Sequence, residues 1–325
     1  MLRLSARVSL LLFQVFFLVL ASTSILVAQK ESKQEETPRG TPVLWRRPVN
    51  IASRDLRLGP GGAAMHPDLQ RVTFLKEEKG GYSTKYRVRD ASGREWVAKI
   101  GKEAQSETAA VRLLWAVGYM TEINYLVPTV EIVGKGMFRN VRFEARPENI
   151  KRLDEWKWSK NPFVGTRELQ GLKVLMALLN NWDIKDSNNK ILLVRDDSAN
   201  ELRYIISDLG ATFGQSGSTP IVWRFTRSRN KPTDYADAEF VDVVVDNNVY
   251  FHYGGKRGSL FGDITVQDAT WIGDLLSQLS TQQLQDAFRA ANYSPAEVNL
   301  LTNEVRERTN ELLRLGSDRQ LGRRR

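Results

Sequence analysis

The chain has 325 residues, of which 42% are hydrophobic and 26% are charged, a composition typical of a folded protein rather than a disordered one. It contains no cysteine and only two histidines, His66 and His252, which excludes disulfides, thiol chemistry and metal centres built from several histidines. The formal net charge is +9, but much of this excess lies at the two ends of the chain, so we expect no nucleic-acid partner.

The first 28 residues are predicted to be an export signal. Arg3 and Arg7 precede an apolar run that extends from Val8 to Ala28, after which the sequence turns abruptly polar. Because this run approaches the ~20 residues that span a bilayer, an uncleaved membrane anchor at 8–28 is the alternative. We therefore expect a secreted or periplasmic protein, or one anchored by this segment. Residues 29–51 are polar and punctuated by proline, which predicts a linker with little capacity to bury side chains.

Residues 52–147 have the pattern of a small antiparallel sheet that carries one helix. Runs of β-forming residues are separated by glycine turns, and one stretch spaces its apolar residues at helical intervals. The predicted elements are strands at 71–76, 84–89 and 95–100, a helix from Glu103 to Gly118, and strands at 125–133 and 136–145.

Residues 148–316 are predicted to be mainly helical. The expected elements are a helix at 166–181, strands at 191–194 and 202–208, a hairpin at 240–253 within the loop-rich segment 211–262, helices near 266–279, 281–290 and 295–315, and a basic tail at 317–325. The sequence therefore predicts an α+β fold with two lobes. The N-terminal lobe is built on a small antiparallel sheet with one helix, and the C-terminal lobe is mainly helical.

Lys99 lies on the third predicted strand, in the sequence WVAKI, between apolar neighbours. A helix carrying Glu107 follows at once, so a Lys–Glu pair can hold the lysine against nucleotide phosphates. Glu103 is an alternative partner for the lysine. A solvated lysine on a strand edge is the simpler interpretation, and it applies to any single lysine.

A polar island interrupts two aliphatic runs in NNWDIKDSNNKILLV, residues 180–194. Phosphoryl transfer to a hydroxyl needs a carboxylate to orient or deprotonate the acceptor, a side-chain oxygen to bind Mg²⁺, and a cation to offset charge. Asp183, Asn188 and Lys185 provide one of each. The alternative is the end of a helix followed by a turn, where Asn and Asp are common.

Asp208 comes directly after an apolar strand and before Gly210, in YIISDLGATFG. A carboxylate at the end of a strand is suited to anchor a Mg²⁺ ion that bridges two phosphates. Upstream, KEEKGGYSTKY forms a predicted strand–turn–strand that can bring backbone N–H groups close to phosphate. The residues involved in that turn are Gly80, Gly81 and Ser83.

These elements follow one another along the chain as a glycine turn, a lysine strand, a glutamate helix, a D-x-K-x-x-N loop and a D-x-G strand end. This order resembles that of the protein-kinase-like superfamily. The D-x-G-x-x-F run at 208–213 is similar to the atypical branch that contains the phosphatidylinositol 3- and 4-kinases, the HipA-like kinases and the secretory-pathway kinases. The resemblance implies that Lys99 contacts ATP phosphates, that Asp183 acts as the base, and that Asn188 and Asp208 hold Mg²⁺.

Three features depart from ordinary protein kinases. Trp182 stands where they carry arginine before the aspartate, the glycine turn lacks a full GxGxxG, and the spacing from Lys99 to Glu107 is short. The segment WRFTRSRNKP carries four cations and no acid, which suits recognition of a phosphorylated or acidic acceptor, with a solvated loop as the alternative. These cations are Arg224, Arg227, Arg229 and Lys231.

The function expected from the sequence is therefore an exported, ATP- and Mg²⁺-dependent phosphotransferase that acts on a hydroxyl acceptor. A pseudokinase-like module that binds a ligand or partner without catalysis is the alternative. The acceptor stays open between a protein, a lipid and a small molecule, and nucleotidyl transfer is a further possibility at the same site.

Overall fold

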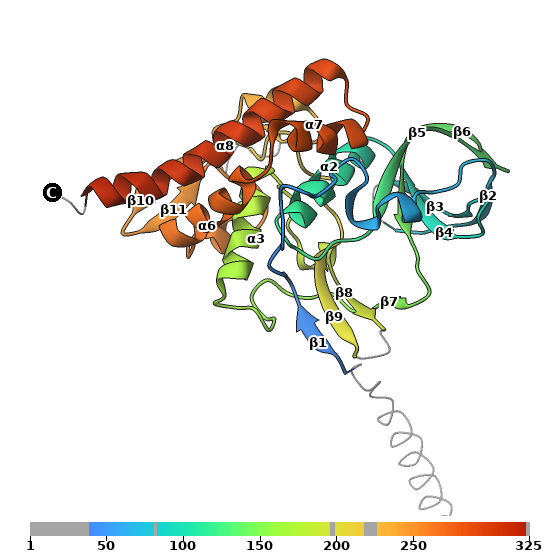
Figure 1. Cartoon of the computed structure of the whole chain (residues 1–325), viewed down its shortest axis with the longest axis horizontal. Coiled ribbons are helices and arrows are strands. Elements are labelled where there is room, and N and C mark those ends of the chain that lie inside the picture. Colours follow the sequence, from blue (N-terminus) through green and yellow to red (C-terminus); the bar gives the residue numbers. More distant parts are fainter. Residues whose placement is uncertain (1–38, 81–82, 196–198, 218–225, 323–325) are drawn as a thin grey trace, which may run out of the picture. The chain divides into compact units, whose positions relative to one another are not determined.

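The computed structural model describes residues 39–80, 83–195, 199–217 and 226–322 (Figure 1). The predicted export segment, Gly81 and Arg224 lie outside these residues. Within the described part of the chain, no helix combines the length and the apolar character that crossing a membrane requires. All elements described below belong to one unit, Gly40–Arg325.

The N-terminal lobe is a closed five-stranded barrel with the strand order β2-β3-β4-β6-β5. Neighbouring strands are antiparallel, except that β2 closes the barrel by pairing in parallel with β5. One helix, α2 (Glu103–Ala116), connects β4 to β5. The strands are β2 (Val72–Glu77), β3 (Thr84–Arg89), β4 (Glu95–Ile100), β5 (Asn124–Val133) and β6 (Gly136–Ala145).

Strand alternation divides the barrel side chains into two sets. Trp96 and Ala98 of β4 and Phe143 of β6 belong to the barrel core and are fully buried. The intervening residues of both strands share the opposite face because cross-strand partners point the same way. Lys99 is the register partner of Arg142, and Val97 is the partner of Glu144. One wall of the barrel therefore presents charged side chains to the cavity described below.

The C-terminal region contains a four-stranded sheet in the order β1-β9-β8-β7. β8 and β9 form a hairpin, and β1 joins β9 in parallel. Sequence analysis placed 41–43 in a polar linker, whereas these residues form a sheet edge and the next residue, Leu44, is buried in the core. The strands are β1 (Thr41–Val43), β7 (Ile150–Arg152), β8 (Asn189–Val194) and β9 (Glu201–Ile206).

Helices form most of the remaining C-terminal region, and α6 packs against both α3 and α8 (Figure 1). Capping boxes at Thr265 and Ser280 start α6 and α7 by satisfying backbone N–H groups of the first turn. The predicted α+β fold with a sheet lobe and a mainly helical lobe is confirmed. The elements are α3 (Arg167–Leu178), α5 (Pro232–Ala236), α6 (Val266–Ser277), α7 (Thr281–Ala290), α8 (Pro295–Gly322), the hairpin β10 (Val241–Val245) and β11 (Asn248–Phe251), and the 3-10 turns η1 (Gly59–Gly61), η2 (Ala63–Met65), η3 (Asp186–Asn188) and η4 (Gly258–Phe261).

Arg308 of α8 holds the C-terminal end of α3 in place and is fully buried. Its guanidinium donates to the carbonyl oxygens of Leu178, Tyr235 and Ala238 at 2.8–2.9 Å and pairs with Glu304. We expect Arg308→Met to lower the free energy of unfolding by about 3 kcal/mol, because three carbonyl oxygens and the Glu304 carboxylate lose the guanidinium as a donor.

Urea unfolding of the purified chain measures this change. Arg314→Met, at an exposed position on the same helix, is the matched control and is expected to change the free energy by less than about 0.5 kcal/mol. Equal effects of the two substitutions would contradict the structural role assigned to Arg308.

Candidate active site

The residues predicted to carry the chemistry converge on one cavity of about 460 Å³. They come from the turn before β3, from β4, from α2, from the loop after α3 and from the end of β9. Those that line the cavity are Ser83, Lys99, Glu107, Asp183, Lys185, Asn188 and Asp208. Gly80 lies in the β2–β3 turn with a positive φ of 104°, but it does not line the cavity.

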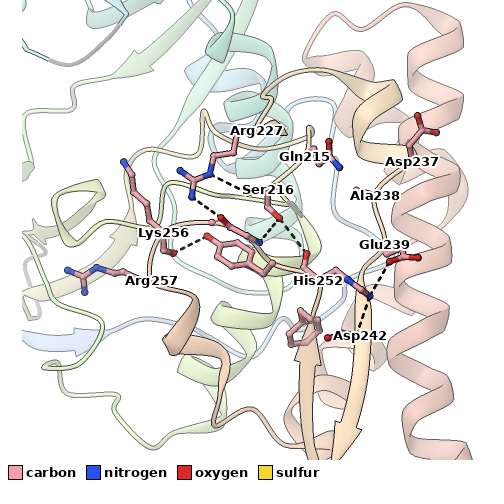
Figure 2. A pocket seen from close by; sticks show the side chains of 15 residues that line it. Gln215, Ser216, Arg227, Asp237, Ala238, Glu239, Asp242, His252, Lys256 and Arg257 are labelled. Carbon is pink, nitrogen blue, oxygen red and sulfur yellow. Dashed lines mark hydrogen bonds and ion pairs between the residues drawn. The ribbon is translucent and has the colours of Figure 1, made fainter. Parts of the chain in front are cut away.

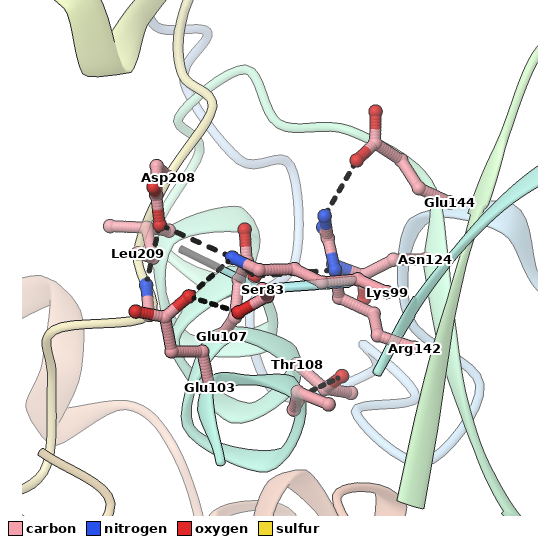
Figure 3. A network of polar contacts seen from close by, with 12 residues as sticks. Ser83, Lys99, Glu103, Glu107, Thr108, Asn124, Arg142, Glu144, Asp208 and Leu209 are labelled. Carbon is pink, nitrogen blue, oxygen red and sulfur yellow. Dashed lines mark hydrogen bonds and ion pairs between the residues drawn. The ribbon is translucent and has the colours of Figure 1, made fainter. Parts of the chain in front are cut away.

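Lys99 is buried and binds two carboxylates of α2 (Figure 3). Its Nζ lies 2.8 Å from Glu107 Oε2, 3.0 Å from Glu103 Oε2 and 3.5 Å from Asp208 Oδ1. Both partners considered from the sequence are therefore used, and the solvated-lysine interpretation is wrong. Burial opposes the ammonium charge, but Glu107 and Asp208 outweigh it and hold the pKa of Lys99 above its ordinary value.

The short spacing between the lysine and its glutamates follows from how α2 begins. Gly101, with φ of 129°, turns the chain from β4 directly into the helix. Glu103 and Glu107 are one helical turn apart, so they stack on the same face of α2 and meet Lys99 together. Ser83 Oγ donates to Glu103 Oε2 at 2.8 Å, which ties the turn before β3 to this pair.

Asp183 extends from the loop after α3 and contacts two lysines. Lys185 Nζ lies 3.0 Å from its Oδ2, and Lys256 Nζ donates to its Oδ1. Burial opposes ionisation, but hydrogen bonds from Lys256 and Lys185 prevail and hold the pKa of the Asp183 carboxyl below its ordinary value. Asp183 is therefore a carboxylate at neutral pH, suited to orient a hydroxyl more than to compete strongly for its proton.

Asn188 connects this loop to the end of β9. Its backbone carbonyl accepts from the N–H of Ser207 at 2.7 Å and from that of Asp208 at 3.3 Å. Its side-chain amide donates to the carbonyl oxygen of Asp183. Because a carbonyl only accepts, the nitrogen must face it, which leaves Oδ1 of Asn188 as the atom available to a ligand.

One carboxylate oxygen of Asp208 binds neighbouring groups of the protein, and the other is available to a ligand. Oδ1 accepts from the N–H of Gly210 at 3.1 Å and contacts Lys99, and 42% of the side chain is exposed. Burial opposes ionisation, but Lys99 and the Gly210 N–H outweigh it and hold the pKa of Asp208 below its ordinary value.

The donor set fits Mg²⁺ better than a metal that needs a full protein cage. In the described ranges, no group of three or more His, Cys, Asp or Glu side chains clusters as a metal site. Mg²⁺ prefers oxygen and is commonly held by one or two carboxylates together with substrate phosphates. Asp208 Oδ2 and Asn188 Oδ1 are two such oxygens on the wall of the same cavity.

Sequence analysis missed a chain of ion pairs that continues from Lys99 along the back of the cavity. Arg142 contacts Glu107 Oε2 at 3.3 Å and Glu144 Oε2 at 2.6 Å. Arg152 of β7 lies 3.1 Å from Glu144, pairs with Glu122 and donates to Ser207 Oγ at 2.6 Å. Charged and apolar residues alternate in VRFEA at 141–145. This alternation predicts a strand with one charged face, and it is the signal from which these residues could have been found.

Glu122 gives this network a pH dependence. Burial and the neighbouring Glu144 raise the pKa of Glu122 to about 7. The folded chain thus keeps a proton that the unfolded chain releases, so Glu122 lowers stability as the pH rises toward 7. We expect wild type to lose about 2 kcal/mol more than Glu122→Gln between about pH 5.5 and pH 8. Arg146 and Arg142 overcome burial to hold the pKa of Glu144 below its ordinary value, so Glu144 titrates outside this window.

Urea unfolding at both pH values tests this prediction. Glu148→Gln, at an exposed position, is the control and is expected to follow wild type. The same pH dependence in Glu122→Gln and wild type would mean that Glu122 does not carry the proton.

Trp182 precedes Asp183 and is surrounded by cations. Arg229 lies 4.6 Å from the ring centroid, Arg227 lies 5.2 Å away and Lys256 lies 5.9 Å away. Arg229 also pairs with Glu103 of α2. Distant segments thus add positive charge beside the loop that carries Asp183. Two residues of the predicted basic segment, Arg227 and Arg229, contact the protein rather than solvent alone.

No model of a protein family matches the chain, and neither does any curated protein. The solved structures to which this chain is similar include two kinases. A proinflammatory kinase of Helicobacter pylori, CtkA, aligns with a TM-score of 0.46 and 13% identity over 77% of this chain and 97% of that one. The Rio2 kinase-ADP/Mg2+-phosphoaspartate complex of Chaetomium thermophilum aligns with a TM-score of 0.31 and 13% identity over 76% of this chain and 74% of that one. Because both identities are low, function is inferred from the geometry of the cavity.

Proposed function

We propose that the protein is a Mg²⁺-dependent phosphotransferase that moves the γ-phosphoryl group of ATP to a hydroxyl. The single observation that carries the proposal is the convergence of Lys99, Asp183, Asn188 and Asp208 on one cavity. These residues are the phosphate-binding lysine, the carboxylate that faces the acceptor and the two metal ligands that phosphoryl transfer requires. A structural ion-pair cluster alone would not need the free oxygens of Asn188 and Asp208.

A second, narrower cavity adjoins the charged one. It has a volume of about 50 Å³, lies where β6 leads into β7, and shares Arg146 and Arg152 with the larger cavity. Five of the ten residues that line it are apolar, and the other five are polar or charged. The apolar residues are Ile123, Ala145, Pro147, Ile150 and Leu192. A cavity of this volume does not enclose a base, so we place only the phosphates, beside Lys99.

The residues of this chain would act mainly by position and charge. Mg²⁺, when bound by Asn188 and Asp208, supplies charge neutralisation for the phosphates. Lys99, held by Glu103 and Glu107, neutralises phosphate oxygens. Asp183 orients the acceptor hydroxyl, whose oxygen forms the new P–O bond as the bond between the γ-phosphorus and the β,γ-bridging oxygen breaks. The hydroxyl proton leaves through Asp183, and ADP is released.

Incubation of the full chain with Mg²⁺ and ATP labelled separately at the α and γ positions tests the proposal. We expect only the γ label to move to the protein or to an added acceptor. Transfer of the α label would indicate nucleotidyl transfer, and transfer of neither label with retained ATP binding would indicate a binding module.

One observation favours the binding module as the second candidate. Both oxygens of the Asp183 carboxylate are held by ammonium groups, from Lys185 and Lys256. A carboxylate that already accepts from two ammonium groups is a weaker acceptor for a hydroxyl proton. Binding of ATP with nanomolar to micromolar affinity and no turnover of either label would therefore favour this candidate.

A further inference from the structure

A second large cavity, of about 790 Å³, lies on the C-terminal region (Figure 2). Its wall is formed by the segments 215–217, 237–242 and 251–257. The volume falls within the range of pockets that enclose small molecules or a few residues of a peptide. None of the sequence motifs predicted this cavity, and the phosphotransferase site described above does not include it.

The cavity wall contacts the loop that carries Asp183. Lys256 lines the cavity, its Nζ binds the Asp183 carboxylate, and its backbone N–H donates to the carbonyl of Trp182 at 2.9 Å. Tyr253, also in the wall, donates to the carbonyl of Asn181 at 2.6 Å. Lys256 therefore stands between this cavity and the Asp183 carboxylate, which lines the other cavity. An acceptor hydroxyl has to pass Lys256 to reach Asp183.

Basic residues occupy the part of the cavity near Asp183, and their hydrogen-bonding groups already contact the protein. Arg257 pairs with Asp186, and Arg227 donates to the carbonyl of Gly254 at 2.8 Å. Lys256 is held by Asp183 itself. These cations occupy the part of the cavity wall that contacts the loop carrying Asp183 and Asp186.

Acidic residues occupy the other part, and their only ion-pair partner within the described ranges is His252. Glu239 Oε2 and Asp242 Oδ1 lie 3.2 Å and 3.4 Å from His252 Nε2, and Asp237 also lines the cavity. We call these three carboxylates the acidic rim. Among the described residues, none of these three carboxylates forms an ion pair with Lys or Arg. Figure 2 shows them on the side opposite Lys256 and Arg257. A cationic group on the acceptor would form ion pairs with these carboxylates.

The surface beyond the acidic rim suits an extended polypeptide. Asp242 lies on β10, and β11 is the only strand that pairs with β10 in the described part of the chain. Several apolar side chains of this hairpin are at least 39% exposed, and such a patch beside a cavity is typical of a docking surface. They are Val243, Val244, Val245 and Tyr250. A small metabolite or a sugar bound in the cavity would not extend over these side chains.

We propose that this cavity binds the acceptor, and that the acceptor is a polypeptide segment in which arginine or lysine flanks the phosphorylated serine or threonine. The assignment rests on the proposed phosphotransferase function. Asp237, Glu239 and Asp242 bind the flanking cations, the β10–β11 hairpin contacts apolar residues further along, and the hydroxyl reaches Asp183. The transfer itself is the step written above, with the seryl or threonyl oxygen as nucleophile.

The test compares two fluorescent serine peptides that differ only in having arginine or glutamine on both sides of the serine. With the full chain and Mg-ATP, we expect kcat/KM to be at least tenfold higher for the arginine peptide. In the variant D237N/E239Q/D242N this preference is expected to disappear through a higher KM. The control variant E131Q/E148Q/D274N makes the same charge change at exposed sites elsewhere and should keep the preference.

Peptide binding, measured by fluorescence anisotropy without nucleotide, separates the two proposals. Selective binding of the arginine peptide that is lost in D237N/E239Q/D242N, with no γ-phosphoryl transfer to any acceptor, would reject the phosphotransferase but support the peptide site. Equal binding of both peptides, or γ-phosphoryl transfer to phosphoinositide vesicles and to neither peptide, would overturn the peptide site.

Discussion

Asp208→Ala is expected to lower kcat/KM for γ-phosphoryl transfer by about 10³-fold or more, with little effect on folding. The substitution removes one of the two protein oxygens available to Mg²⁺. Lys99 keeps Glu103 and Glu107 as partners at 3.0 Å and 2.8 Å, so no buried charge is left alone. The Asp208 side chain is more exposed than those of Lys99, Glu103 and Glu107. The free energy of unfolding should therefore change by less than about 1 kcal/mol.

Measuring kcat/KM over a range of Mg²⁺ concentrations, with urea unfolding alongside, tests this expectation. Asp208→Asn keeps an oxygen ligand but loses the charge, so we expect it to recover part of the activity at high Mg²⁺. Asp274→Ala, on the exposed face of α6, is the control and should be as active as wild type. Turnover by Asp208→Ala at the wild-type rate would reject the assignment of Asp208 as a metal ligand.

The parts of the site that could be predicted from the sequence are those whose partners are close along the chain. Lys99 and its glutamates are separated by fewer than ten residues, so the strand and the helix alone indicated that they meet. The loop from Asp183 to Asn188 was recognisable for the same reason. The choice between Glu103 and Glu107 could not be made, because helix geometry allows both and the structure uses both.

The parts that could not be predicted depend on contacts between distant segments. Lys256 reaches Asp183 across 73 positions of the chain, and Arg229 reaches Glu103 across 126. Nothing in a surface-type sequence such as YGGKRG distinguishes Lys256 from a solvated lysine. Likewise β1 pairs with β9, and a strand of three residues in a polar stretch carries too little hydrophobic pattern to separate it from a linker.

The buried charges at the back of the cavity show a second limit of sequence reasoning. Arg142 and Glu144 are each 3% exposed, although charged residues are seldom buried unless they are paired. Their pairing with each other and with Glu107 and Arg152 is what makes burial tolerable. A pattern of alternating residues predicts that they share a face, but it does not reveal that this face is covered.

Asp183→Asn is expected to lower kcat by about 10³-fold while leaving the affinity for Mg-ATP within about threefold of wild type. The amide cannot accept the hydroxyl proton, and it orients the acceptor less strongly than a carboxylate does. The donor contacts remain, because Lys99, Asn188 and Asp208 are unchanged. A loss confined to kcat would distinguish Asp183 from the residues that bind the nucleotide.

The pH dependence provides an independent readout of the same residue. Because Lys256 and Lys185 hold the pKa of Asp183 below its ordinary value, the carboxylate stays ionised well below neutral pH. The rate of wild type should therefore not fall through protonation of Asp183 between about pH 8 and pH 5. Lys185→Met and Lys256→Met each remove one of these cations, which should move the acidic limb of the pH–rate profile of kcat to higher pH. An unchanged acidic limb in both variants, or a full kcat in Asp183→Asn, would show that Asp183 does not face the acceptor and would favour a site that binds nucleotide without turning it over.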